Sequence, residues 1–373
     1  MSTISQRSMG YRVSSAREAS GMTQEALAKS LGLKDRQSVS DIETGKRSLK
    51  PEELMILAEL FNRDIEFFID PFVVAGEAQF SWRVDPAVTQ ASLDDFEDKA
   101  GQWIGLMRWM RELTEMPSDG GLKLSLQLTK NSTYEIAQDR AEAFVSKFEL
   151  GQAPAERLIE TVERDLDIPV LFVDTIEAGA GKSISGATCH LEDMRVILIN
   201  RNENEARRHY DLAHELFHAL TWDTMKPDHR ESNSPLERSR GKRIEELANN
   251  FAASLLMPIS SIAELLEEEK LDDVAHLVDV AARLRVAPSA FGWRLLNLGL
   301  IGQTTCTQLT KERQKTHSQP KPKKFSSAFA KMLHDCLDHG KLSARKAAKV
   351  TGLGLAGLQE LFQEYELPPA FDL

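Results

Sequence analysis

The chain has 373 residues, of which 42% are hydrophobic and 28% are charged, as expected for an ordinary globular protein of two or three domains. Its net charge of -11 argues against a protein that coats nucleic acid along its whole length. The charge is uneven, since residues 1–50 contain nine lysines or arginines against five acidic residues. This locally basic segment in an acidic chain predicts a separate module with a partner of its own.

Nothing in the sequence indicates a membrane or secretory segment. No stretch approaches the roughly 20 consecutive apolar residues of a membrane helix, and the first residues, MSTISQRSMGYRVSS, lack the apolar core of a secretory signal. The cysteines Cys189, Cys306 and Cys336 lie too far apart for a disulfide framework or a thiolate metal site. We therefore expect a protein of the reducing cytoplasm that makes no membrane contact.

Residues 10–70 predict a compact all-helical unit. Apolar residues recur at helical spacing in MTQEALAKSLGL, in RQSVSDIE and in PEELMILAELF. The first two segments have the layout of a helix-turn-helix, in which Thr23 caps the first helix and Gly32 allows the tight turn. The side chains expected in the shared interior are Leu27, Leu31, Val39 and Ile42.

Side chains on the outer face of this motif are candidates for DNA contact. If Val39 and Ile42 point inward, their neighbours on the second helix can reach base edges, and the residues just beyond it can meet the phosphate backbone. The expected DNA-binding residues are Gln24, Arg36, Gln37, Ser38, Ser40, Thr44, Lys46 and Arg47. The alternative is a small helical docking domain that never touches DNA.

The same segment resembles the XRE-type (Cro/repressor-like) helix-turn-helix family over residues 12–63. The shared pattern is T-Q-x-x-L-A, then an L-G turn, then I-E-x-G-x-R. The chain departs from it by one extra residue in the turn LGLKDRQS, which leaves the register of Arg36 and Gln37 open by one position. The resemblance implies binding to operator-type DNA sites. Because such domains often occupy two half-sites, it also implies a homodimer.

Composition and periodicity divide the rest of the chain after this N-terminal domain (1–72) into four parts. Helical patterns over 73–132 predict a helical connector, and 133–302 predict a mixed domain with strand-like segments IPVLFVD, SISGATC and MRVILIN. Residues 303–327 have the composition of a basic flexible linker, and 328–373 predict a small helical unit like a second helix-turn-helix. The expected fold class is α+β and mostly helical, with a sheet of about three strands.

The segment DLAHELFHAL, residues 211–220, is the strongest chemical signal in the chain. His214 and His218 are four residues apart, so a helix presents both to one ion, and Glu215 beside them can activate a water molecule. A five-residue match is only suggestive by itself, and a third ligand is needed. Glu245 and Asn249 share a face of the later helix RIEELANNFAASLLM, where Glu245 can complete the ligand set and Asn249 can orient a ligand histidine. The alternative is a pair of satisfied core histidines.

The longer pattern around these residues resembles the ImmA/IrrE family of metallopeptidases over about residues 135–300. It runs through a hairpin ending in I-x-I-N, then A-H-E-x-x-H, then E-x-x-A-N-x-F-A-x-x-L-L-M-P. The resemblance implies a gluzincin-like catalytic domain in which His214, His218 and Glu245 bind the metal and Glu215 is the catalytic base. Zinc suits two imidazoles and a carboxylate, and Mn²⁺ also fits them.

The chain departs from this family pattern at two places. Phe217 stands where glycine is usual, and Tyr210-Asp211 stands where an aromatic residue followed by threonine is common. A bulky Phe217 can narrow the cleft, so this departure bears on turnover more than on metal binding.

These observations predict a DNA-binding transcriptional regulator with a zinc-dependent endopeptidase domain that hydrolyses one specific protein, such as a repressor or another regulatory protein. The alternative is a non-proteolytic transcription factor or antitoxin whose metal-site domain senses a ligand or binds a partner. A third reading is a degenerate domain without metal that serves dimerisation. The role of the C-terminal unit stays open.

Overall fold

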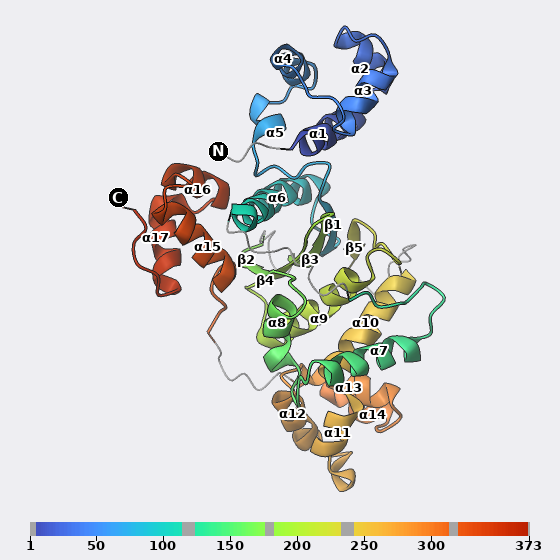
Figure 1. The fold of residues 1–373 in the computed structure, drawn as a ribbon. Helices are drawn as coiled ribbons and strands as arrows, with labels where there is room; N and C mark the ends of the chain where they lie inside the picture. Colours follow the sequence, from blue (N-terminus) through green and yellow to red (C-terminus); the bar gives the residue numbers. More distant parts are fainter. Residues whose placement is uncertain (1–4, 114–123, 176–182, 233–241, 313–319, 372–373) are drawn as a thin grey trace. The chain divides into compact units, whose positions relative to one another are not determined.

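The computed structural model describes residues 5–113, 124–175, 183–232, 242–312 and 320–371. This part of the chain contains helices α1 to α17 and one sheet of five strands (Figure 1). The predicted α+β, mostly helical fold class is therefore confirmed, although the sheet has two strands more than expected. No helix in the described ranges combines the length and the apolar character needed to cross a membrane.

The chain folds into two compact units, each built from segments far apart in the sequence. The first unit comprises Met1–Gln79, Gln90–Ser118 and Ser327–Leu373, and the second comprises Phe80–Thr89 and Asp119–Ser326. This division differs from the expected series of consecutive domains. The reason lies in the expected connector: β1 (Gln79–Val84) joins the sheet of the second unit, whereas α6 (Gln90–Leu113) packs in the first.

Five short helices form the N-terminal part of the first unit. They are α1 (Gln6–Ala19), α2 (Gln24–Ser30), α3 (Arg36–Glu43), α4 (Pro51–Leu60) and α5 (Ile65–Ile69). Thr23 caps α2 through the Ala26 amide at 3.2 Å, and Asp35 caps α3 through the Ser38 amide at 2.9 Å. Because a cap satisfies amides that a helix start leaves free, Asp35 sets the register that the extra turn residue left open.

The interior of this helical domain contains the side chains that the sequence predicted. Leu27, Leu31, Val39 and Ile42 are buried, and they form one cluster with residues of α1, α4 and α5. Gly32 has a φ of 64°, a left-handed conformation that glycine adopts without a steric cost. The expected helix-turn-helix geometry, a turn between two helices that share a core, is present.

The remaining helices of the first unit come from the two other segments. Helix α6 packs against α15 (Ser327–Asp338) and α16 (Ala344–Thr351), and α17 (Gly354–Glu364) follows. The buried indole nitrogen of Trp103 on α6 donates to the Thr351 carbonyl oxygen at 3.2 Å. The expected C-terminal helical unit exists, and it belongs to the same compact unit as the helix-turn-helix.

The sheet of the second unit has the strand order β2-β4-β3-β1-β5. The strands β2 (Val170–Val173), β3 (Ile184–His190) and β4 (Arg195–Asn200) are the three that the sequence predicted. Strand β4 pairs in parallel with β2 and antiparallel with β3. The two unexpected strands extend the sheet beyond β3, where β1 pairs in parallel with β5 (Arg230–Ser232).

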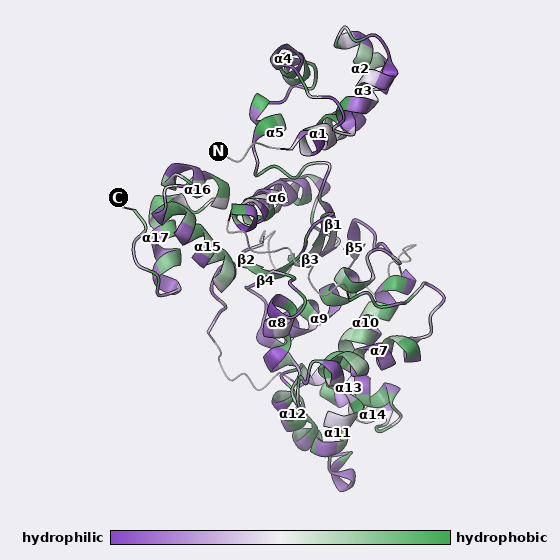
Figure 2. Ribbon diagram, viewed as in Figure 1, coloured by the Kyte–Doolittle hydropathy of each residue, from purple (hydrophilic) through white to green (hydrophobic). Residues whose placement is uncertain are grey.

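Helices pack against one side of this sheet and supply most of the core of the second unit (Figure 1). They are α7 (Tyr134–Lys147), α8 (Ala155–Arg164), α9 (Glu205–Thr221), α10 (Lys242–Leu256), α11 (Ile259–Leu265), α12 (Val274–Arg283), α13 (Pro288–Asn297) and α14 (Gln303–Leu309). Helix α10 packs against both α7 and α9, and α9 packs against β3 and β4. Figure 2 shows apolar and polar residues alternating along these helices, and the buried residues of α10 are almost all apolar.

The expected linker over residues 303–327 is replaced at both ends by ordered structure. Helix α14 buries Cys306 and Leu309 in the main core, which makes it part of the second unit. At the other end, Phe325 exchanges two backbone hydrogen bonds with Phe172 of β2. The segment is polar in composition, but Cys306, Leu309 and Phe325 are buried. The burial of these apolar residues explains why both ends of the segment are ordered.

Candidate metal centre

Helix α9 presents His214 and His218 on one side. The helix starts at the Asn204 cap, whose side chain accepts from the Arg207 amide at 2.9 Å, and it runs through the core between the sheet and α10. Both histidines are almost completely buried, with 1% and 0% of their surface exposed. Their Nε2 atoms lie 3.1 Å apart. The four-residue spacing therefore brings the two imidazoles together as predicted.

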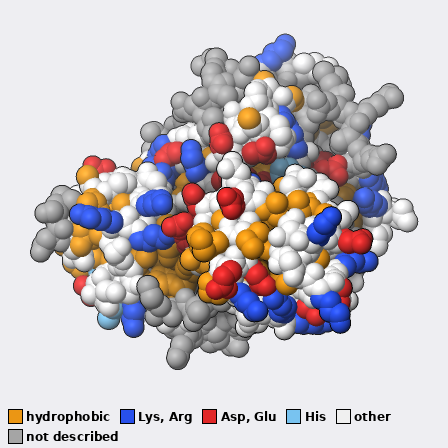
Figure 3. Space-filling view, turned by 90° about the horizontal axis from the view of Figure 1, so that it is seen from above, with side chains coloured by type: hydrophobic (Ala, Val, Ile, Leu, Met, Phe, Trp, Pro, Cys, Tyr) orange, Lys and Arg blue, Asp and Glu red, His pale blue; other side chains and the backbone are white. Residues whose placement is uncertain are grey.

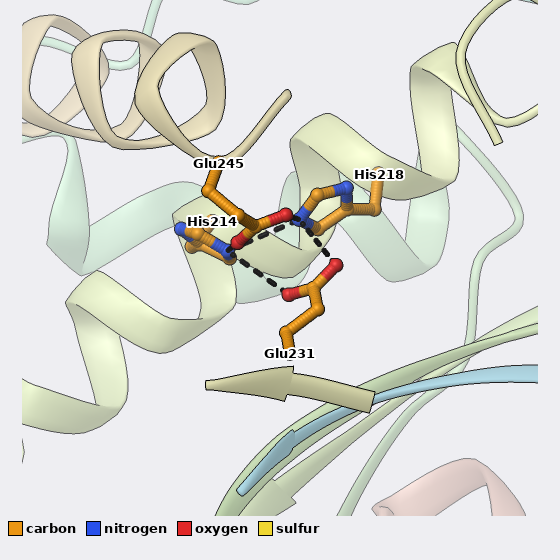
Figure 4. A group of neighbouring side chains, drawn as sticks. All are labelled: His214, His218, Glu231 and Glu245. Atoms are coloured by element: carbon orange, nitrogen blue, oxygen red, sulfur yellow. Dashed lines mark hydrogen bonds and ion pairs between the residues drawn. The ribbon is translucent and has the colours of Figure 1, made fainter. Parts of the chain in front are cut away.

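Two carboxylates from other elements face this pair of histidines (Figure 4). Glu245, in the first turn of α10, has Oε2 at 3.2 Å from His214 Nε2 and Oε1 at 3.7 Å from His218 Nε2. Glu231, on β5, has Oε2 at 3.6 Å from His214 Nε2 and Oε1 at 3.4 Å from His218 Nε2. One nitrogen or oxygen from each of the four side chains lies within 4.8 Å of the others.

The donor set of this cluster fits a divalent cation. The buried atoms Glu231 Oε2 and Glu245 Oε1 have no hydrogen-bond partner among the described residues, and an unpaired buried charge is costly. A tetrahedral zinc with bonds of about 2.0–2.1 Å separates two ligand atoms by roughly 3.3 Å, close to the observed Nε2–Nε2 distance. Two imidazoles and two carboxylates that converge in this way can hold an ion that offsets their negative charge.

Electrostatics prepare the histidines to bind a metal. Burial lowers the pKa of both His214 and His218, which keeps the imidazoles neutral with a free lone pair. Burial and the neighbouring Glu231 charge raise the pKa of Glu245 to about 8. Burial also opposes ionisation of Glu231, but the two histidines outweigh it and hold the pKa of Glu231 well below its ordinary value. Without a cation, Glu245 therefore holds a proton at neutral pH.

A hydrogen-bond chain sets the tautomer of His214. The Tyr210 hydroxyl donates to Asn249 Oδ1 at 3.1 Å, and His214 Nδ1 lies 3.1 Å from the same oxygen. Because that oxygen is an acceptor, His214 carries its proton on Nδ1 and directs the Nε2 lone pair into the cluster. The Asn249 side chain thus lies against the outer nitrogen of His214, where the sequence placed it.

Glu215 lies beside the cluster with one free oxygen. Thr188 of β3 donates through its hydroxyl to Glu215 Oε2 at 2.8 Å, whereas the buried Oε1 has no hydrogen-bond partner among the described residues. Burial, reinforced by the charge of Glu231, raises the pKa of Glu215 well above its ordinary value. A carboxyl group with one fixed and one free oxygen is suited to exchange a proton with a neighbouring molecule.

The two departures from the family pattern have structural explanations. Phe217 points into the core, where its ring lies 5.5 Å from that of Phe251, so it fills space behind the helix. Its ring also lies 5.7 Å from that of His218, and the expected narrowing of the cleft by Phe217 stays a prediction. Asp211 is completely buried and pairs with Arg83 of β1 at 3.0 Å and with Arg207 at 3.1 Å. This residue therefore ties α9 to a strand that the family pattern does not include.

A cavity of about 790 Å³ lies next to the outer side of His214. Arg83, Tyr210 and Asn249 line it on the side of the metal cluster, and Met257 and the half-exposed Trp293 line it elsewhere. Its wall combines apolar side chains with an equal share of polar ones, among them three arginines and four asparagines, which could bind a ligand with polar groups.

Sequence reasoning missed Glu231 and the β1 residues that support it. Glu231 is a lone acid in HRES, a segment too short to show any periodicity. Its role depends on β1, which lies about 150 positions earlier in the chain, as the separation between Ser81 and Glu231 indicates. Only its buried position beside the two histidines, seen in the structure, identifies it.

The outer face of the helix-turn-helix presents only some of the predicted DNA-binding residues freely. Arg36, Gln37, Thr44 and Lys46 are exposed, and Ser38 and Ser40 are half-buried. Gln24 donates to Glu43 at 2.7 Å and accepts from Arg36 Nε at 2.9 Å, which links α2 to the start of α3. Arg47 instead forms a bidentate pair with Glu53, at 2.9 and 2.5 Å.

Comparison with known families agrees with this two-part organisation. Residues 13–68 match the helix-turn-helix family model, and residues 164–296 match the model of the IrrE N-terminal-like domain, a peptidase family. No curated protein matches the chain. The predicted fusion of a helix-turn-helix with an ImmA/IrrE-type domain is confirmed, and the metal cluster lies inside the second matched range.

Proposed function

We propose that this chain, which joins a DNA-binding helix-turn-helix to an IrrE N-terminal-like peptidase domain, is a transcriptional regulator that hydrolyses a specific regulatory protein. The observation that carries the proposal is the convergence of His214, His218 and Glu245 beside the free oxygen of Glu215. Two imidazoles and one carboxylate from a later helix form a gluzincin-type ligand set, and the glutamate next to the first histidine is the base of such sites.

The proposed chemistry is metal-assisted hydrolysis of one peptide bond. The two histidines and Glu245 would hold a zinc ion, which would supply a Lewis acid to polarise the peptide carbonyl and acidify water. Glu215 Oε1 takes the proton from the attacking water and returns it to the leaving nitrogen, while Thr188 holds the other oxygen. Asn249 keeps His214 in the metal-binding tautomer. Mn²⁺ can replace zinc in this donor set.

The helix-turn-helix supplies the DNA half of the proposed function. Arg36, Gln37 and Thr44 are exposed on or beside α3 and suit contact with base edges, while Lys46 suits contact with phosphate. Gln24, Ser38 and Ser40 remain candidates at the rim of this face. We assign Arg47 a structural role through Glu53 in addition to any contact with DNA.

A homodimer is part of the proposal. The side chains of α4 and α5 that are both apolar and exposed are Met55, Ile56, Leu60, Ile65 and Ile69. Figure 3 shows that apolar side chains reach the surface between acidic and basic ones on the face seen from above. Apolar side chains gathered on two consecutive helices are suited to contact between two copies on adjacent half-sites.

A second candidate function is a metal-containing sensor without proteolysis. The cavity of about 790 Å³ next to His214 favours it, because a small ligand bound there would contact Tyr210 and Asn249 and so reach the metal cluster. In this alternative, Glu215 has no catalytic task.

Cleavage in cells separates the two candidates. New protein N-termini are compared between cells that produce the wild-type chain and cells that produce Glu215→Gln, which keeps the Thr188 contact but cannot accept a proton. The proposal expects a cleaved DNA-binding regulator in the wild type and at least a roughly 100-fold lower yield in the variant. Equal cleavage in both, with equal protein levels, would exclude Glu215 as the base.

A further inference from the structure

Glu231 occupies a position that a working metallopeptidase leaves open. The ligand set His214, His218 and Glu245 has three protein side chains, and a catalytic zinc site keeps its fourth position for water or substrate. Glu231 approaches both histidines as closely as Glu245 does, from the opposite side of the cluster (Figure 4). A centre with four protein ligands is closed, as structural zinc sites are.

A short strand holds Glu231 in this position. Strand β5 has three residues and pairs in parallel with β1, with Glu231 opposite Arg83. The Ser81 hydroxyl, also on β1, lies 2.8 Å from Glu231 Oε1 and 2.8 Å from the Asp228 carbonyl oxygen. Glu231 is therefore held in place by the Ser81 hydroxyl and by the short backbone pairing between β5 and β1.

Arg230 fastens the same strand to the loop after β1. Its guanidinium NH2 donates to the carbonyl oxygens of Val88 at 2.7 Å, Pro86 at 3.2 Å and Asp85 at 3.3 Å. The Trp82 amide adds a bond of 2.9 Å to the His229 carbonyl oxygen. These contacts are polar and lie at the edge of the sheet, so they can be exchanged for others without opening the core.

The place of β5 is also the place that suits an extended peptide. Unpaired strand edges bind extended chains by adding them as a further strand. Strand β5 lies along β1 at the end of the sheet order and directs Glu231 to the histidines. Within the described residues, β5 therefore pairs with β1 next to the metal cluster. An extended substrate segment would pair with β1 in the same way.

We propose that Glu231 is a removable fourth metal ligand and that β5 is a built-in strap, so that the structure is the latent form of the peptidase. Substrate gains access to the metal when the strap leaves β1 and Glu231 withdraws. The inference rests on the proposed metal site, and it concerns the regulation of that site.

Cobalt substitution in the full-length protein tests the strap without any substrate. The visible bands of Co²⁺ change when a ligand is added or exchanged, and acetohydroxamate is a small chelating probe for an open position. The wild-type protein is compared with Glu231→Gln and Arg230→Ala. The matched control is Glu246→Gln, because Glu246 neighbours Glu245 but its carboxylate contacts the Tyr134 hydroxyl instead of the cluster.

The closed site predicts a clear order of responses. Acetohydroxamate leaves the Co²⁺ spectrum of the wild type and of Glu246→Gln unchanged and shifts that of Glu231→Gln. Arg230→Ala, which alters no group of the cluster, also shows the shift, at a probe concentration at least about tenfold below the highest one that leaves the wild-type spectrum unchanged. Both variants keep near one cobalt per chain, because the other three ligands remain.

Two results would contradict the proposed role of Glu231 and β5 but leave the proposed metal site standing. One is a wild-type spectrum that responds to acetohydroxamate as readily as that of Glu231→Gln, which means that the fourth position is already open. The other is a complete loss of cobalt from Glu231→Gln, which makes the acid an indispensable ligand. Failure of the wild type itself to bind cobalt or zinc is a different result, because it removes the proposed function along with the strap.

Discussion

The two functional regions of this chain differ in how strongly the fold constrains their polar groups. At the metal centre, His214, His218 and Glu231 are at most 4% exposed. On the outer face of the helix-turn-helix, Arg36 and Lys46 are exposed. Buried polar groups without partners cost free energy, so their convergence demands a chemical explanation. Exposed groups carry no such cost, so their function rests on charge and family resemblance.

Of the experiments that compare the two regions, removal of the metal should have the largest effect. Chelation leaves the buried carboxylate of Glu231 and the half-buried carboxylate of Glu245 without their cation, so the second unit should lose stability while the helix-turn-helix does not. An ion present at about 1,000 times its Kd contributes about 4 kcal/mol, which is a Tm shift of roughly 10 °C. Calorimetry with and without chelator measures it, and His218→Ala is the control that should no longer respond. An identical Tm in the wild type would contradict the account.

Replacing Asn249 tests the outer contact of His214. Asn249→Ala removes the acceptor that holds the Nδ1 proton, and such supporting contacts are typically worth about 10- to 100-fold in metal affinity. Competition with a zinc chelator measures this affinity. Asn250→Ala, at the next position, contacts Gln138 and the Glu246 carbonyl oxygen and should change the affinity little. Equal losses in both variants would point to helix damage.

Substitutions of Lys46 and Arg47 test the DNA-binding side, where we expect the smallest effects. Lys46→Ala should weaken binding to all DNA sequences and reduce the salt slope by about one, with no change in Tm. Arg47→Ala removes the ion pair of the buried Glu53 carboxylate, which keeps only its hydrogen bond from the Lys50 amide, and should cost about 1–3 kcal/mol of stability. Fluorescence anisotropy at several salt concentrations and thermal melts separate the two. Loss of stability in the Lys46 variant would contradict this assignment.

The part of the site that sequence could predict is the part encoded by helical spacing. His214 and His218 are one turn apart on α9, and Glu245 and Asn249 are one turn apart on α10, so each pair shares a face wherever the helices lie. The helix-turn-helix core followed from the same periodicity, with Val39 and Ile42 buried as expected.

The rest of the site depends on pairing between distant segments, which local patterns do not encode. Strand β1 reads as part of a helical connector until it is seen in the sheet, and β5 is too short for an alternating pattern. Glu231 and Ser81 are consequently invisible to motif reasoning, although they contact each other in the fold. Polar composition likewise suggested a linker where α14 buries Leu309.

The most direct test of the central claim is the metal content of the purified protein, with His218→Ala beside the wild type. His209→Ala is the matched control, because His209 lies on the same helix but contacts the Arg285 carbonyl oxygen outside the cluster. The account predicts near one zinc per chain in the wild type and in His209→Ala, and almost none in His218→Ala. Absence of metal from the wild type after zinc is supplied would contradict it, and the second unit would then have no peptidase chemistry.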